Sequence, residues 1–221
     1  MTGLLYVVAT PIGNLEDISA RAIKVLSQVN RIAAEDTRHS SRLLQHLGIN
    51  TPLVAVHDHN EAGRVQSLID QLLAGDSIAL ISDAGTPLIS DPGYRLVAAA
   101  HQANIQVVPV VGACAAIAAL SAAGLPSDRF SFEGFLAAKT SQRQTQLKAL
   151  ANESRTLIFY EAPHRILECV QDMAAIFGAD RRVVLARELT KTFETIKQCT
   201  LAELSVFVES DTNQQRGEIV L

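Results

Sequence analysis

The 221-residue sequence lacks the short motifs that mark common nucleotide-binding and hydrolytic folds. Its 12 glycines are spread so widely that the chain contains neither a G-x-G-x-x-G fingerprint nor a P-loop. It also contains no G-x-S-x-G nucleophile elbow and no C-x-x-C pair. These absences argue against an ordinary dinucleotide-binding fold and against a P-loop NTPase.

Cysteine and basic charge are also scarce. The three cysteines, Cys114, Cys169 and Cys199, are far apart and odd in number, which is typical of a reduced cytoplasmic protein. The net charge is −4 and neither half of the chain is basic, so bulk charge alone does not indicate a nucleic-acid partner. Cationic residues are denser in the second half, at Lys139, Arg143, Lys148, Arg181, Arg182, Arg187 and Lys191.

No segment is a convincing membrane span. Residues 107–126 carry no charge, but proline and glycine interrupt them and much of the remainder is alanine. They are better interpreted as a buried strand, a turn and a packed helix. The first residues lack the charged start of a signal peptide and run directly into an apolar stretch. We therefore expect a cytoplasmic protein without a membrane partner.

Apolar runs and helical patterns alternate through the first half of the chain, which predicts an α/β domain with a mainly parallel sheet over residues 1–125. The expected strands are 4–9, 31–34, 53–56, 77–81 and 106–110. One helix is expected to begin at Ser19, and four others are expected at 39–47, 61–74, 92–103 and 113–123.

The composition changes at residues 125–129, and we expect a second α/β domain over residues 126–221. Its helices are expected at 139–151, 163–177 and 201–209, and its strands at 130–136, 155–160, 183–187, 195–200 and 218–221. Polar and apolar residues alternate over 192–200, which predicts antiparallel pairing and hence a mixed sheet. Because the chain ends inside an expected strand, a shortened C-terminus is expected.

Residues 82–93 form the most informative stretch. They join a buried strand to a helix and contain two glycines, two prolines and two aspartates. Asp91 is expected to cap that helix, with Pro92 at its first position. The loop is about twice as long as an ordinary connection of this kind, and long structured loops are usually functional.

Polar or glycine-bearing clusters follow four of the expected strands, at 10–14, 35–38, 57–61 and 82–92. In a parallel sheet these clusters lie at one edge, where such sheets bind ligands. Small residues there allow a ligand to approach the backbone closely. Few charges lie among the small residues and prolines at 11–13, 85–86 and 112–115, so these positions suit an adenine, a ribose and a zwitterionic tail better than a triphosphate.

A metal site is not expected. His57 and His59 lie beside Asp58 and Glu61, but neighbouring side chains point in different directions and no third cluster has zinc spacing. A hydrogen-bonding substrate edge or a plain turn explains these residues better.

Several motifs carry a family resemblance. The sequence resembles the ribosomal small-subunit RNA methyltransferase I family, within the tetrapyrrole-methylase superfamily. The matching segments are Ala9–Leu15, Ala34–Arg38, Ser82–Gly93, Ser121–Pro126, Arg129–Leu136 and Leu185–Lys191. The resemblance implies a two-domain tetrapyrrole-methylase-like fold and an S-adenosylmethionine-dependent methyl transfer. The acceptor would be a cytidine 2′-hydroxyl in 16S rRNA within an assembled 30S subunit.

The resemblance also implies a homodimer, with the cofactor in the cleft between the two domains. The family pattern places cofactor contacts at Pro11, Asp83, Ala84, Gly85, Thr86, Leu88, Cys114, Ala115, Tyr160, Glu161, Arg187, Leu189, Glu218 and Ile219.

The open, substrate side carries the candidate catalytic residues Glu35, Asp36, Arg38 and His57. A simpler interpretation of Glu35, Asp36 and Arg38 is a salt-bridged helix N-terminus. The sequence departs from the family pattern at Val111-Gly112-Ala113, where Pro-Gly-Pro is usual. Family members also continue some tens of residues further.

Two alternatives remain open at this point. The first is a methylase of a small planar substrate such as a tetrapyrrole, and the second is a non-enzymatic S-adenosylmethionine-binding regulator. An enclosed apolar acceptor cavity would favour the first, whereas an open charged face beside Arg38 and His57 would favour RNA.

Overall fold

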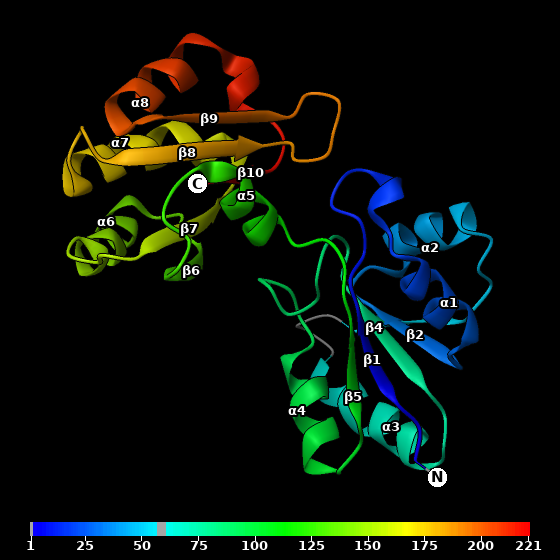
Figure 1. Ribbon diagram of the computed structural model, residues 1–221. Helices are drawn as coiled ribbons and strands as arrows, with labels where there is room; N and C mark the ends of the chain where they lie inside the picture. The colour runs from blue at the N-terminus through cyan, green and yellow to red at the C-terminus, as the bar shows by residue number, and fades with distance from the viewer. Residues whose placement is uncertain (1, 57–60) are drawn as a thin grey trace. The chain divides into compact units, whose positions relative to one another are not determined.

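The computed structural model describes residues 2–56 and 61–221, which form two compact units, residues 1–114 and 115–221 (Figure 1). Each unit contains one five-stranded sheet. The sequence analysis placed the boundary after Leu125, whereas the helix Ala115–Ala123 (α5) groups with the second unit. That helix belongs to the second unit because it packs against strands of the second sheet.

The first sheet is entirely parallel and has the strand order β3-β2-β4-β1-β5. Its strands are β1 (Leu5–Val8), β2 (Arg31–Ala34), β3 (Leu53–Ala55), β4 (Ile78–Ile81) and β5 (Val107–Val110). All four residues of β4 are buried because helices cover both faces. The parallel sheet predicted from the sequence is therefore confirmed.

Four helices cover this sheet: α1 (Ala20–Gln28), α2 (Thr37–His46), α3 (Glu61–Leu73) and α4 (Tyr94–Gln102). Apolar residues of α1 and α2 pack with Ala79 and Ile81 on one face, and those of α3 and α4 pack with Ile78 and Leu80 on the other. The chain thus leaves the neighbouring strands β1 and β4 toward opposite faces. The ends of these two strands form the topological switch point, where open α/β sheets bind ligands.

The start of α4 corrects one expectation. The helix begins at Tyr94 with Gly93 as its N-cap, instead of at Pro92 with Asp91 as cap. Gly93 has a φ of 123°, and a Cβ there would lie 2.7 Å from a Leu80 methyl group. Only glycine fits this close approach, so the loop extends past Asp91 before the helix can start.

The second sheet is mixed and has the order β6-β7-β10-β8-β9. Its strands are β6 (Phe130–Phe135), β7 (Thr156–Glu161), β8 (Arg182–Arg187), β9 (Thr195–Thr200) and β10 (Ile219–Val220). Strands β6 and β7 are parallel, whereas β10 is antiparallel to both of its neighbours and β9 is antiparallel to β8. The antiparallel pairing expected for residues 195–200 is confirmed.

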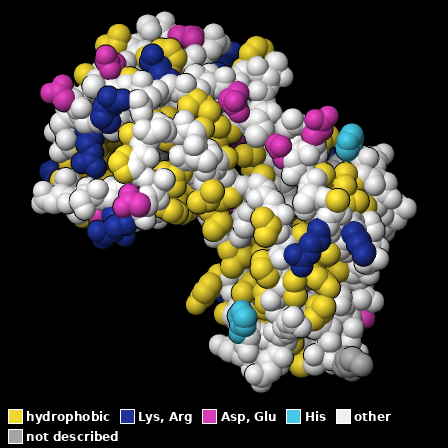
Figure 2. Space-filling view, in the orientation of Figure 1, with side chains coloured by type: hydrophobic (Ala, Val, Ile, Leu, Met, Phe, Trp, Pro, Cys, Tyr) yellow, Lys and Arg dark blue, Asp and Glu magenta, His cyan; other side chains and the backbone are white. Residues whose placement is uncertain are grey.

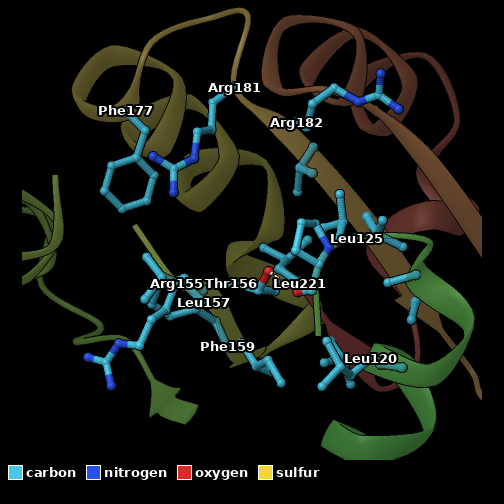
Figure 3. A pocket seen from close by; sticks show the side chains of 18 of the residues that line it. Leu120, Leu125, Arg155, Thr156, Leu157, Phe159, Phe177, Arg181, Arg182 and Leu221 are labelled. Carbon is cyan, nitrogen blue, oxygen red and sulfur yellow. Dashed lines mark hydrogen bonds between the residues drawn. The ribbon is translucent and has the colours of Figure 1, made fainter. Parts of the chain in front are cut away.

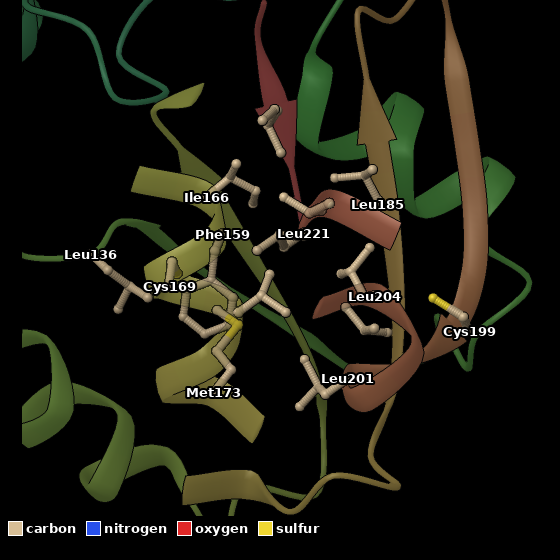
Figure 4. Close-up of a cluster of buried hydrophobic side chains, with 14 of the residues drawn as sticks. Leu136, Phe159, Ile166, Cys169, Met173, Leu185, Cys199, Leu201, Leu204 and Leu221 are labelled. Carbon is tan, nitrogen blue, oxygen red and sulfur yellow. The ribbon is translucent and has the colours of Figure 1, made fainter. Parts of the chain in front are cut away.

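Helices α6 (Thr140–Leu150), α7 (Ile166–Phe177) and α8 (Leu201–Ser210) supply the main core of this unit. Figure 4 shows Met173 and Leu204 converging on Phe159 and Leu221 of the sheet. Short 3₁₀ turns lie at Leu15–Asp17, Pro163–Arg165 and Thr212–Gln215. In the part of the chain that the structure describes, no helix is both long and apolar enough to cross a bilayer.

Candidate functional site

The ends of β1 and β4 are joined directly. Thr10 and Gly85 form an isolated antiparallel bridge, in which Thr10 N donates to Gly85 O at 2.9 Å and Gly85 N donates to Thr10 O at 3.1 Å. The buried Thr10 hydroxyl also donates to the carbonyl of Ser82 at 3.3 Å. The long loop is therefore fixed to the first strand at the switch point, although the sequence analysis named neither Thr10 nor Ser82 as a site residue.

Two glycines permit close packing in this region. Gly85 has a φ of 83°, and a Cβ there would lie 3.2 Å from Ile12 Cγ2. A Cβ at Gly112 would lie 2.8 Å from the Cβ of Ala9. Gly85 is buried with both of its backbone polar groups bonded to Thr10, whereas Ala84 and Gly112 are exposed and Pro11 is half-buried.

Backbone strain continues along the same loop. Leu88 and Ser90 have φ values of 73° and 68°, which residues with side chains seldom adopt. The Thr86 hydroxyl donates to Ala113 O at 2.8 Å and so connects the loop to the segment that follows β5, next to Cys114. Such strained conformations persist only where contacts with the surrounding structure hold them in place, and they often occur at ligand sites.

The end of β2 joins the same assembly through Asp36. Its backbone N–H donates to Asp83 Oδ1 at 3.1 Å. Its side chain caps α2 by accepting from Arg38 N at 2.8 Å and forms an ion pair with Arg38 Nη2 at 3.3 Å. Hydrogen bonds from Arg38 hold the pKa of Asp36 below its usual value. The structure thus shows the salt-bridged helix N-terminus that the sequence left open, with Arg38 almost fully exposed.

Asp91 is a perturbed carboxyl group in the same loop. Burial raises its pKa to about 6, opposed by a hydrogen bond with Ser82 and reinforced by the nearby charge of Asp83. Perturbed carboxyl groups cluster at functional sites. The sequence signal was present, because Asp91 lies in the conspicuous loop, but it was interpreted as a helix cap.

The predicted cofactor residues of the second unit share one end of its sheet. Ile219 pairs with Glu161 on one side and with Arg187 on the other. Tyr160 pairs with Val220, and its hydroxyl accepts a hydrogen bond from Ala116 N at 3.1 Å at the start of α5. The register thus brings together residues that are far apart in sequence.

Two of these side chains are already engaged. Glu161 Oε1 accepts from Arg165 Nη2 at 2.7 Å, and its Oε2 is buried without a hydrogen-bond partner among the described residues. Arg187 is buried and donates to the Gln214 side chain and to the carbonyls of Phe193 and Arg216. A ligand at this edge would therefore meet mainly the backbone of these two residues.

The loop after β8 is strained and acidic. Glu188 and Thr190 have positive φ, and the buried Leu189 lies between them. Lys191 Nζ lies 2.8 Å from Glu188 Oε1 and 2.9 Å from Glu218 Oε2. Burial alone would lower the pKa of Lys191, but the two carboxylates raise it. This ion-pair network was not expected from the sequence.

The structure thus brings together, within the first unit, Pro11, Asp83–Thr86, Leu88 and the Glu35–Arg38 segment, with Cys114 next to the Thr86 contact. Ala115 begins α5 in the second unit. His57 lies outside the described residues. No group of three or more potential metal ligands occurs among the residues that the structure describes.

Charge at the surface is mixed. Figure 2 shows Lys and Arg side chains interspersed with Asp and Glu on the visible face of the second unit. Arg143, counted in the sequence among the cationic residues, is buried and lies 2.6 Å from Asp172. Together with Arg187, it is removed from any cationic surface.

Comparison with known proteins gives consistent matches. The profile of the tetrapyrrole (corrin/porphyrin) methylases matches residues 4–205. A protein of Pseudomonas aeruginosa named ribosomal RNA small subunit methyltransferase I is 64% identical over 219 residues, covering 99% of this chain and 78% of that relative. A protein of Vibrio cholerae with the same name is 60% identical, covering 99% of this chain and 76% of the relative.

Solved structures of low identity share the fold. A uroporphyrin-III-C-methyltransferase of Thermus thermophilus superposes with a TM-score of 0.66 at 20% identity, covering 99% of this chain and 93% of its own. A diphthine synthase superposes with a TM-score of 0.74 at 16% identity, covering 99% of this chain and 89% of its own.

Proposed function

The chain belongs to the tetrapyrrole methylase family, and from this membership we propose that it methylates small-subunit ribosomal RNA with S-adenosylmethionine as methyl donor. The observation that carries the proposal is the identity of 57–64% over at least 99% of this chain to relatives named ribosomal RNA small subunit methyltransferase I. Within the family, this similarity favours RNA over a tetrapyrrole as the substrate.

The residues at the switch point suit such a donor. When bound, S-adenosylmethionine supplies an electrophilic methyl group, so no protein nucleophile or metal is needed. Ala84 and Gly112 are exposed and small, so a nucleoside can approach their backbone, and the Thr10–Gly85 bridge holds the loop rigidly. Rigid placement and exclusion of water are the main contributions expected of the protein.

We propose that Glu35, Asp36, Arg38 and His57 serve the acceptor side. Both carboxylate oxygens of Asp36 accept hydrogen bonds from Arg38. A carboxylate with a lowered pKa is a weak base, so this geometry favours a role for Asp36 in orienting the guanidinium. An exposed guanidinium of fixed orientation is suited to bind an RNA phosphate.

The finer proposal names the acceptor as a cytidine 2′-hydroxyl of 16S rRNA in the assembled 30S subunit. In that reaction the donor would supply the methyl group to the ribose oxygen, S-adenosylhomocysteine would be the leaving group and the hydroxyl proton would pass to water. The family resemblance supports this choice, as well as a cytoplasmic homodimer, whose oligomeric state light scattering would measure.

A labelled-methyl assay tests the proposal. Purified protein is incubated with methyl-labelled S-adenosylmethionine and with 30S subunits, free 16S rRNA, uroporphyrinogen or no acceptor. We expect label in 30S subunits, recovered as 2′-O-methylcytidine after digestion to nucleosides. Label in the porphyrinogen would establish the tetrapyrrole alternative. Binding of the donor without transfer to any acceptor would establish a regulator.

A further inference from the structure

Three aromatic rings meet near the carboxyl ends of β6 and β7 in the second unit. The Phe132 and Tyr160 rings lie 4.9 Å apart between centroids and cross at 70°, and the Phe135 and Tyr160 rings lie 5.6 Å apart and cross at 66°. Both pairs have the edge-to-face geometry that aromatic side chains prefer. We call Phe132, Phe135 and Tyr160 the aromatic cluster.

An irregularity in β6 brings the two phenylalanines together. Residues three positions apart in a regular strand point to opposite faces of the sheet. Here the register with β7 shifts between Phe132 and Gly134, and Gly134 has a φ of 66°. The extra residue turns the strand, so Phe135 contacts the same Tyr160 ring as Phe132 does. Bulges of this kind re-aim side chains and are common beside active sites.

The Phe135 ring is exposed on a fixed support. Phe135 is the last residue of an edge strand, and 53% of its surface is exposed. Tyr160, against which it packs, is held at its hydroxyl by the hydrogen bond from Ala116 N. A planar ligand could therefore stack on a ring that is already oriented, and such preorganisation lowers the entropic cost of binding.

The aromatic cluster adjoins the proposed donor contacts of the second unit. Phe135 pairs with Tyr160, and the next residue of β7, Glu161, pairs with Ile219. Tyr160, Glu161 and Ile219 are all among the residues proposed to contact the donor. In an RNA acceptor, the base is attached to the ribose that receives the methyl group. A flat surface beside the donor contacts therefore suits that base.

An exposed cation follows the cluster along the chain. The segment after β6 is held against α6, because Ala137 N donates to Gln146 Oε1 at 2.9 Å and Arg143 donates to Ala138 O at 3.4 Å. The next residue, Lys139, is exposed at the start of α6. Proteins that bind single-stranded nucleic acids combine aromatic side chains for the bases with cations for the backbone.

We propose that Phe135, supported by Tyr160, is a stacking site for an unpaired base of the RNA acceptor. The inference rests on the proposed function, because it takes RNA as the substrate. Phe135 positions the acceptor and has no part in the transfer of the methyl group. Recognition by stacking needs no net positive charge, which agrees with the net charge of −4.

Phe135→Leu tests the role of the ring, because leucine keeps an apolar side chain and removes the aromatic face. We expect the affinity for 30S subunits in filter binding to fall at least fivefold, the lower limit of base–aromatic stacking. Donor affinity, measured by calorimetric titration, should stay unchanged and shows that the fold is intact. Phe135→Trp keeps a ring and should retain the affinity for 30S subunits.

Phe130→Leu is the matched control. Phe130 is 40% exposed and lies at the opposite end of β6, where it pairs with Thr156. Figure 3 shows that Thr156 lies at a cavity of about 380 Å³, lined also by Leu157 and Arg181 and not by Tyr160. Phe130→Leu should therefore leave the affinity for 30S subunits unchanged.

Tryptophan fluorescence reports the contact directly, because the chain contains no tryptophan. The sole tryptophan of Phe135→Trp should be quenched by a five-nucleotide cytidine RNA and not by an abasic oligomer of the same length. The tryptophan of Phe130→Trp should not be quenched by either. Equal quenching by the two oligomers would overturn the inference, since the base would then make no contact.

The failure of this inference differs from the failure of the proposed function. Equal affinities of Phe135→Leu and Phe130→Leu for 30S subunits, with methyl transfer intact in the native chain, would overturn the stacking site alone. A loss of donor affinity in Phe135→Leu without loss of affinity for 30S subunits would also overturn it, since the ring would then serve the donor adenine. A native chain that neither binds nor methylates 30S subunits would refute the proposed function and this inference with it.

Discussion

At the residue scale, Gly85→Ala should have two separate effects, one on protein stability and one on donor binding. We expect Gly85→Ala to cost about 1–2 kcal/mol of stability, because an L-residue is strained at a φ of 83°. We also expect at least a tenfold loss of S-adenosylmethionine affinity, since the new Cβ would lie 3.2 Å from Ile12 Cγ2 and would disturb the Thr10–Gly85 bridge that fixes the loop. Urea unfolding and calorimetric titration measure the two effects.

Gly48→Ala is the matched control. Gly48 has a φ of 69°, but a Cβ there meets nothing within 4 Å, and the residue lies outside the proposed site. It should lose similar stability and keep donor affinity. Equal affinity losses in both variants would remove the Gly85 region from the donor site.

Asp91 predicts a pH dependence of stability. Its pKa is about 6 in the folded protein, above the ordinary value of 3.8, so between these values the folded state binds more protons than the unfolded state. The contribution of Asp91 to stability is therefore greatest below pH 4 and falls as pH rises to about 6. After discounting for partial exposure, we expect a loss of about 1–2 kcal/mol over this window.

The measurement is the difference in unfolding free energy between the native chain and Asp91→Asn from pH 4 to pH 7. The native chain should become progressively less stable relative to the variant. Asp180→Asn, which removes an exposed carboxylate from the second unit, serves as the control for lost charge. A constant Asp91 difference across the range would contradict the expected pKa.

At the scale of elements, Asp36 has two separable roles, as the cap of α2 and as the ion partner of Arg38. Asp36→Ala should cost about 1 kcal/mol through the lost cap and should reduce methyl transfer while donor binding persists. Asp36→Asn keeps a good cap but removes the charge. We expect it to retain stability and to show the same fall in turnover.

Ser19→Ala is the control for the lost helix cap, because the Ser19 side chain caps α1 by accepting a hydrogen bond from Ala22 N at 3.1 Å. It should cost similar stability without altering turnover. Full methyl transfer in both Asp36 variants would exclude this residue from the mechanism.

Arg143 connects α6 to α7 inside the second unit. Its buried Nε lies 2.6 Å from Asp172, so Arg143→Ala would leave that carboxylate without its cation. We expect a loss of about 3–5 kcal/mol in urea unfolding. Arg155→Ala, which breaks a partly exposed pair with Glu153, should cost less than about 1 kcal/mol. Similar losses in the two variants would contradict a structural role for the buried pair.

At the scale of the whole molecule, charge limits how the protein can recognise RNA. The net charge is −4, Arg143 and Arg187 are buried, and Lys191 is paired with two carboxylates. These three side chains are therefore not available to phosphates, and the other cations lie on a chain with more carboxylates than cations. We expect affinity for 30S subunits to fall less than about 100-fold between 50 and 200 mM salt, compared with the 10³–10⁵ typical of six to ten phosphate contacts.

Filter binding across that salt range measures the slope, and free 16S rRNA is the comparison. We expect free RNA to bind more weakly, because recognition then depends on the shape of the assembled particle. A steep slope would instead indicate a cationic stripe assembled from Lys139, Lys148, Arg181 and Arg182.

The sequence by itself determined the elements and the place of the long loop at residues 82–93. Apolar runs such as Ile78–Ile81 are long enough only for strands, and glycine and proline interrupt the chain where strands end. Local patterning therefore predicted the parallel first sheet, the mixed second sheet and the loop at residues 82–93. Motifs, which depend on residue identity and not on spatial arrangement, were sufficient to indicate the family.

Only the tertiary structure decided which groups are available for chemistry. Hydrogen bonds between distant residues fix Thr10 to Gly85 and Asp36 to Asp83, and burial sets the pKa of Asp91. Likewise, Arg187 is buried at a position where its strand pairs with β10 across a long separation in sequence. Such contacts join residues far apart along the chain, so no local sequence pattern encodes them.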